Sequence, residues 1–214
     1  MNRRKALNST LWNSVSLPSA YMRLPYVLGN NSASHFDTGI SGTNENLRIQ
    51  LCMEMNFTAS YFYLFGNYVD ETTNCWRLIT TNTGDSFYFT PGTRANTSGV
   101  VNLGSSYVDR KIYFDLQRSL AFGVAENVRY KTGTSYKNGT ANSGNIILGY
   151  SHAGNGSSSS SKRVKWYYCT IWDNGVLIRN YIPCKRVSDD KPGFYDTIND
   201  AFKISDGSKD FLLP

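Results

Sequence analysis

Residues 164–183 read VKWYYCTIWDNGVLIRNYIP and contain the clearest hairpin signal of the chain. Two runs rich in aromatic and β-branched residues, 164–172 and 176–183, flank the tripeptide Asp173-Asn174-Gly175. An Asn-Gly pair readily adopts the positive φ angles that a tight type I′ turn requires. We therefore predict a β-hairpin centred on Asn174 and Gly175.

A second strand is predicted over residues 47–57. The odd-numbered positions from Leu47 to Phe57 are all apolar, and polar residues dominate the even-numbered positions between them. Successive side chains of a strand point to opposite faces of the sheet, so this alternation predicts one buried and one solvated face.

Other short aromatic or β-branched runs are bounded by Gly, Asn, Asp or Pro, as strands usually are. They cover residues 61–68, 75–80, 86–90, 107–117, 120–130, 145–150, 193–196 and 201–204. Many short strands with regular turn signals indicate a β-sandwich or barrel.

The composition agrees with an all-β domain. The 214 residues are 18% charged and 14% aromatic, and the net charge is +6. Few charges and many aromatic residues exclude a helical bundle and argue against general disorder. The length suits one β-rich domain with a real core. The excess of positive charge permits attraction to anionic partners but does not require it.

Residues 1–18 are predicted to form an N-terminal arm, and residues 19–214 the domain itself. The arm is basic at its start, and apolar residues recur within it at helical spacing. Polar residues interrupt any apolar run, so a signal peptide is not indicated. Two interpretations stay open, a frayed terminus and a segment that docks on a partner. The docking residues would be Arg3, Arg4, Lys5, Leu7, Leu11 and Trp12. Residues 151–163 are rich in Gly and Ser and predict a flexible loop inserted between two strands.

The cysteines and histidines do not indicate a metal site. Four cysteines lack any Cys-x-x-Cys spacing, and the chain has only two histidines. Four cysteines in a chain of this size favour a reducing compartment. Cys169 and Cys184 lie on the two arms of the predicted hairpin but not opposite each other, so we predict free, partly buried thiols. No cofactor is expected.

Both ends of the chain resemble one protein family. Residues 19–27 (SAYMRLPYV) and 35–40 (HFDTGI) are similar to its opening, and residues 168–184 (YCTIWDNGVLIRNYIPC) and 193–199 (GFYDTIN) are similar to its end. The family is the concanavalin A-like, laminin G-like jelly roll found in phage virion proteins and gut-bacterial surface proteins. Pro25 stands where the family usually has Glu, and residues 29–32 (GNNS) replace its Ser-Thr-Gly turn. The resemblance implies a sandwich of two antiparallel sheets in which the first and last strands pair.

Catalysis is not predicted. Jelly-roll glucanases use the spacing Glu-x-Asp-x-x-Glu to place two carboxyl groups about the scissile bond. None of Glu45, Glu54, Glu71 and Glu126 begins such a motif. A nucleophilic mechanism would need His35 or His152 as the base, and both are interpreted as loop or strand-edge histidines.

The resemblance also makes Ca²⁺ worth testing, since many laminin G-like domains hold one at the rim. Loop carboxylates that could contribute are Asp37, Asp70, Glu71, Asp109 and Asp173. No dense Asp-x-Asp spacing links them, so solvated turn residues are the favoured interpretation.

Sugar binding would use exposed aromatic faces beside polar groups. The residues predicted to bind carbohydrate are Trp76, Tyr107, Tyr136, Tyr150 and Trp166. The alternative, that such rings belong to the core, applies to about half of them or more. The basic clusters are dispersed along the sequence, which does not favour nucleic acid.

These observations predict a non-enzymatic structural, decoration or adhesion protein of a phage virion. The arm would attach it to other virion proteins, several copies would be displayed, and the sandwich would bind host glycans. It would be made in the host cytoplasm and would not insert into a membrane. The alternatives are a bacterial cell-surface carbohydrate-binding module and, less favoured, a glycan-cleaving enzyme.

Overall fold

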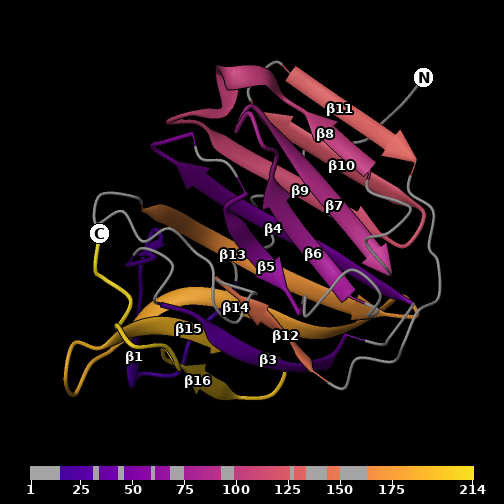
Figure 1. Ribbon diagram of the computed structural model, residues 1–214. Coiled ribbons are helices and arrows are strands. Elements are labelled where there is room, and N and C mark those ends of the chain that lie inside the picture. The colour runs from indigo at the N-terminus through magenta and orange to yellow at the C-terminus, as the bar shows by residue number, and fades with distance from the viewer. Residues whose placement is uncertain are drawn as a thin grey trace, which may run out of the picture.

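The computed structural model describes residues 15–30, 34–42, 46–58, 61–67, 75–92, 99–125, 128–133, 144–149 and 163–214. These residues form two antiparallel β-sheets packed face to face (Figure 1). The strands are β1 (Tyr21–Arg23), β2 (Val27–Leu28), β3 (Phe36–Ser41), β4 (Leu47–Met55), β5 (Tyr63–Gly66), β6 (Cys75–Thr80), β7 (Ser86–Gly92), β8 (Gly99–Asn102), β9 (Lys111–Gln117), β10 (Leu120–Ala125), β11 (Val128–Gly133), β12 (Asn145–Leu148), β13 (Val164–Asp173), β14 (Val176–Arg186), β15 (Pro192–Asp196) and β16 (Ala201–Lys203). A short 3-10 turn, Gly104–Tyr107, lies between β8 and β9.

Along the sequence, the chain passes repeatedly from one sheet to the other. The large sheet has the order β11-β10-β9-β4-β13-β14-β15-β16, with β1 beside β14 and β2 beside β13. The small sheet has the order β3-β12-β5-β6-β7-β8. Figure 1 shows the small sheet lying over the large one, with β10 and β11 toward one end of the sandwich and β1, β15 and β16 toward the other. The predicted all-β sandwich of two antiparallel sheets is confirmed.

The hairpin predicted from residues 164–183 is β13 and β14. Asn174 and Gly175 have φ angles of 48° and 80°, as a type I′ turn requires. Asp173 pairs with Val176 across that turn. Cys169 pairs with Tyr181, which confirms that Cys169 and Cys184 are not opposite each other.

Strand β4 lies at the centre of the large sheet, between β9 and β13. Its odd-numbered residues are buried in the core, as predicted. Its even-numbered face is only partly solvated: Arg48 is exposed, whereas Cys52 is 1% exposed. Tyr113 and Tyr168 flank Cys52 on the two neighbouring strands, and rings in those positions keep water from the thiol.

Two expectations about the strands were wrong. Residues 120–130 do not form one strand, because the chain reverses between β10 and β11, where Ala125 pairs with Val128. Asn127 alone is a weak turn signal, so sequence patterns missed this reversal. The first strand does not pair with the last: β1 pairs with β14, and β16 pairs with β15. The two ends of the described chain meet instead at Leu28 and Leu212, which exchange main-chain hydrogen bonds of 3.0 and 2.9 Å.

Aromatic pairs join the two sheets. Phe87 of the small sheet and Phe114 of the large sheet have ring centroids 5.1 Å apart. Near the other end of the sandwich, Phe36 lies 4.9 Å from Tyr181 and 5.3 Å from Phe194. Such tilted and edge-on pairs add specific attraction to the apolar area they bury.

Residues 1–14 of the predicted arm and residues 151–162 of the predicted loop lie outside the described residues. The part of the arm that is described is held to the domain, because the Arg23 guanidinium donates a 2.5 Å hydrogen bond to the carbonyl of Val15. None of the helices in the described ranges is long and apolar enough to cross a membrane.

Candidate binding face on the large sheet

The side of the large sheet that points away from the small sheet carries a connected set of charged, amide and aromatic side chains. Its side chains belong to alternate positions of β4, β9 and β13, whose other positions fill the core. We call this surface the outer face. Its members are Arg48, Gln50, Glu54, Lys111, Tyr113, Asp115, Lys165, Tyr167 and Trp172, joined by Tyr26, which contacts Tyr167 from just before β2.

Glu54 lies at the centre of a compact group that we call the Glu54 cluster: Tyr26, Glu54, Lys111, Lys165 and Tyr167. The ammonium of Lys165 donates to Oε1 of Glu54, and the hydroxyl of Tyr167 donates to Oε2 over 2.7 Å. The Nζ atom of Lys111 lies 4.3 Å from the ring centroid of Tyr167. The rings of Tyr26 and Tyr167 meet edge to face, with centroids 5.6 Å apart. Their mutual contacts fix the rings of the cluster in place.

A bulge in β13 makes this cluster possible. Trp166 pairs with Met53 and faces the core, whereas Tyr168 pairs with Cys52, so Tyr167 is an extra residue between two regular pairs. A bulge re-aims the side chains around it. Here it brings the Tyr167 hydroxyl to Glu54 on the outer face while the Trp166 ring stays buried.

The cluster keeps its charges near neutral pH. Burial alone would raise the pKa of Glu54, but hydrogen bonds from Lys165 and Tyr167 together with the nearby ammonium groups outweigh burial and lower this pKa. The hydrogen bond to Glu54 raises the pKa of Lys165. Burial, followed by the hydrogen bond to Glu54, raises the pKa of Tyr167. Near neutral pH Glu54 is therefore a carboxylate, Lys165 an ammonium group and Tyr167 a neutral phenol.

A second group lies further along the same strands. Arg48 binds Asp115 with both arms of its guanidinium, Nε to Oδ1 at 2.9 Å and a terminal nitrogen to Oδ2 at 2.6 Å. Gln50 donates to Oδ2 of Asp115 over 3.1 Å. The guanidinium carbon of Arg48 lies 5.5 Å from the centroid of Trp172. Trp172 is partly exposed, so this group also combines an aromatic surface with fixed polar groups.

Three of the residues predicted to bind sugar belong to the core instead. Trp76 and Tyr107 are fully buried and Trp166 is 1% exposed, so the prediction is wrong for these three. Trp76 packs against Phe89, and the Tyr107 hydroxyl donates to the carbonyl of Gly84. Trp76 in β6 and Trp166 in β13 turn their rings into the core, and Tyr107 enters the core from the 3-10 turn that ends at it. Tyr136 and Tyr150 lie outside the described residues, as do the predicted docking residues Arg3, Arg4, Lys5, Leu7, Leu11 and Trp12.

The rim carboxylates serve local structure. Asp37 accepts hydrogen bonds from the amide of Gly39 at 2.6 Å and from the side chain of Asn145 at 3.0 Å. Asp173 flanks the hairpin turn and accepts from Asn174. Within the described ranges no three His, Cys, Asp or Glu residues are grouped as metal ligands would be. Asp70 and Glu71 lie outside those ranges.

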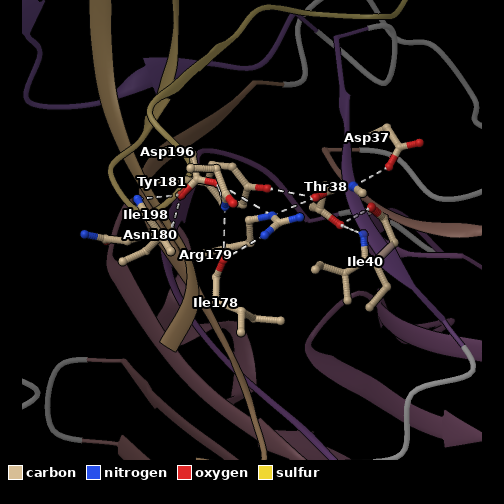
Figure 2. A network of polar contacts seen from close by, with 12 residues as sticks. Asp37, Thr38, Ile40, Ile178, Arg179, Asn180, Tyr181, Asp196 and Ile198 are labelled. Atoms are coloured by element: carbon tan, nitrogen blue, oxygen red, sulfur yellow. Dashed lines mark hydrogen bonds and ion pairs between the residues drawn. The ribbon is translucent and has the colours of Figure 1, made fainter. Parts of the chain in front are cut away.

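The polar residues of the family-like C-terminal motifs form a joint between the sheets (Figure 2). Arg179 points from β14 toward β3 and donates to the carbonyl of Thr38 over 3.0 Å. The Tyr181 hydroxyl donates to the same oxygen over 3.1 Å. Asp196 is 1% exposed, lies 3.6 Å from Nε of Arg179, and accepts 3.1 Å bonds from the amides of Asn180 and Ile198. These contacts stabilise the fold, and the outer face is the better candidate for binding.

Comparison with known proteins adds no family assignment. No protein-family model matches the chain, and no curated protein matches it either. Similar solved structures include mouse laminin α1 chain domains LG4-5, with 13% identity over 76% of this chain and 44% of that one, at a TM-score of 0.43. Another, described as HCR/D-Sa-GBL1/C, has 12% identity over 62% of this chain and 32% of that one, at a TM-score of 0.36. The chain thus spans less than half the length of either structure, and at TM-scores below 0.5 neither similarity identifies a ligand.

Proposed function

We propose that this protein is a non-enzymatic adhesion or decoration protein of a phage particle that binds host glycans through the outer face. The observation that carries the proposal is the Glu54 cluster, in which partly exposed tyrosine rings stand beside fixed charged groups. The sequence resemblance to a family common in phage virion proteins supports the setting. A bacterial cell-surface carbohydrate-binding module is the alternative setting for the same face.

The outer face has the features that sugars need. Sugar rings have apolar faces that pack on aromatic rings, and hydroxyl groups that bind to charged or amide partners. Tyr26, Tyr167 and Trp172 offer rings, and Glu54 and Asp115 offer carboxylates already held in position. Groups fixed before binding lose little conformational entropy on binding, which favours affinity. Neighbouring strands lie about 4.8 Å apart, so the three strands β9, β4 and β13 give a surface wide enough for an oligosaccharide.

Display of the protein in many copies would strengthen its binding to a glycan-covered surface. A single sugar contact is weak, and linked copies raise the effective concentration at the second site. In this proposal residues 1–18 attach the domain to other virion proteins. A chain that lacks residues 1–18, compared with the full chain by sizing with light scattering, tests whether the arm controls assembly.

A glycan-array screen of the full chain tests the binding function. The matched variants are Tyr26→Ala and Trp172→Ala on the outer face, with Val176→Ala as the control, since Val176 is 64% exposed at the hairpin tip. We expect saturable binding that falls in the first two variants and is unchanged in the third. Absence of binding to every glycan, or equal binding by all three variants, would overturn a binding role for the outer face.

Labelling with an antibody distinguishes the two settings. Antibody against the domain should decorate purified phage particles if the protein is a virion component. Label found only on the bacterial envelope would favour the cell-surface module and contradict the virion assignment.

A further inference from the structure

Lys111 is the member of the Glu54 cluster whose charge is not neutralised. It is exposed at the start of β9 and pairs in register with Glu54. Glu54 is already bound by Lys165 and by the Tyr167 hydroxyl. Within the described part of the chain, the ammonium of Lys111 makes no hydrogen bond or ion pair, and its close contact is the ring of Tyr167 at 4.3 Å.

The carboxylates near the cluster act on Lys165: Glu54 binds it, and Asp109 lies close enough to interact with it. The ammonium of Lys111, which lies over the Tyr167 ring, keeps its three N–H donors for another partner. The ring of Tyr167 restrains the position of this ammonium, and Lys111 is exposed. An anionic group that approached Lys111 would also meet the partly exposed rings of Tyr26 and Tyr167.

We infer that the Glu54 cluster binds the carboxylate of an acidic sugar, with Lys111 as its cationic partner and Tyr26 and Tyr167 as the aromatic surface for the sugar ring. This inference rests on the proposed function and specifies its ligand class. A sugar that bears one carboxylate matches both features of the site, because it combines an apolar ring face with a single negative charge.

A nucleic acid fits the cluster less well. Its backbone carries one phosphate per nucleotide, and its binding sites track that backbone with a row of cations. In the described part of the Glu54 cluster, Lys111 is the one cation without an ion pair, because Lys165 is bound by Glu54. A ligand with widely spaced charges, at most one for each sugar ring, is the better match.

The test compares acidic glycans with their neutral counterparts. The probes are sialyllactose against lactose, and polygalacturonate against the same polymer after chemical reduction of its carboxyl groups. The variants are Lys111→Gln and Lys111→Arg, with Lys209→Gln as the control, because Lys209 is exposed near the C-terminus and its loss changes the net charge equally. Binding to single-stranded DNA is measured in the same buffer.

We expect the unaltered protein to bind an acidic probe better than its neutral counterpart. Lys111→Gln should weaken that binding about five- to tenfold, the magnitude of a charge-assisted contact at a partly exposed site. Lys111→Arg should retain most of the binding, and Lys209→Gln should retain all of it.

Three results would overturn the inference. Equal binding of acidic and neutral probes, with weaker binding by Tyr26→Ala, would support glycan binding by the outer face. It would contradict the inference that the ligand is an acidic sugar. Equal weakening by Lys111→Gln and Lys209→Gln, together with binding to DNA, would indicate general attraction to polyanions. Failure to bind any glycan would contradict the proposed function as well.

Discussion

The guanidinium of Arg179, in the large sheet, donates a 3.0 Å hydrogen bond to the main-chain carbonyl of Thr38, in the small sheet. The same guanidinium lies 3.6 Å from the carboxylate of Asp196. Asp196 is buried and also accepts from the amide of Ile198 in the turn after β15. One side chain thus joins three segments of the sandwich.

Replacing Arg179 with Met should destabilise the protein by about 3 kcal/mol, because the buried Asp196 carboxylate would lose its charged partner and keep only its amide donors. Denaturation by urea, followed by tryptophan fluorescence, measures this loss. Arg48→Met is the control: Arg48 is more exposed, and its variant should lose about 1 kcal/mol or less. Equal losses in the two variants would show that the inter-sheet joint contributes no more than a surface ion pair.

Replacement of Gly193 by alanine should cost much more stability than replacement of Gly175. A Cβ atom on Gly193 would lie 2.2 Å from the carbonyl oxygen of Lys203 and 3.0 Å from the Phe202 ring, so Gly193→Ala should displace β16 and cost more than about 2 kcal/mol. A Cβ atom on Gly175 would meet nothing within 4 Å, and only its φ of 80° opposes alanine, which costs about 1 kcal/mol. Thermal unfolding of both variants gives the comparison. A larger loss for Gly175→Ala would contradict the packing of β16 on β15.

Stability should decline in acid partly through Glu54. Its pKa is lower in the folded protein than in the unfolded chain, so its contribution is complete above the unfolded pKa and disappears as the pH falls through the folded pKa. Glu54→Gln should therefore make the free energy of unfolding less dependent on pH below about pH 5. Urea denaturation at several pH values between 3 and 7 (roughly the titration range of carboxyl groups) tests this. A variant with an unchanged pH profile would show that the contacts of Glu54 contribute no stability.

The four cysteines should be unreactive in the native state. All four are buried and free of disulfides, and burial raises the pKa of Cys52 and of Cys184 to about 12. A thiol reacts as its thiolate, so little reaction with Ellman's reagent is expected at pH 8 until denaturant is added. Rapid reaction of any thiol in native protein would mean that the sheet opens locally at that cysteine.

The sequence predicted the fold more fully than the binding face, for reasons visible at particular residues. The Asn174-Gly175 turn and the alternation along β4 depend only on residues that are neighbours in the sequence, so both could be predicted from short stretches of it. The Glu54 cluster depends on the register of β4 with β9 and β13. No local pattern reveals that Glu54 and Lys165, 111 residues apart, share a face.

The aromatic residues also show that local sequence patterns do not reveal which side chains reach the outer face. Trp166 and Tyr167 are adjacent, and a sequence pattern ranks the larger ring first. The bulge between Trp166 and Tyr168 decides that Tyr167 reaches the outer face while Trp166 enters the core. Bulges follow from the fit between two strands, so the partner strand had to be known before the exposed ring could be chosen.

The pairing of β4 with β13 also constrains how the protein is made. During translation β4 leaves the ribosome early, and its neighbour β9 soon follows, but β13 emerges only when most of the chain has been synthesised. Until then one edge of the central strand has no partner, and an open strand edge invites association with other chains. Pairing across such a sequence separation is also slow to form. We therefore expect the nascent chain to depend on chaperones, and truncated products that end before residue 164 to aggregate rather than fold.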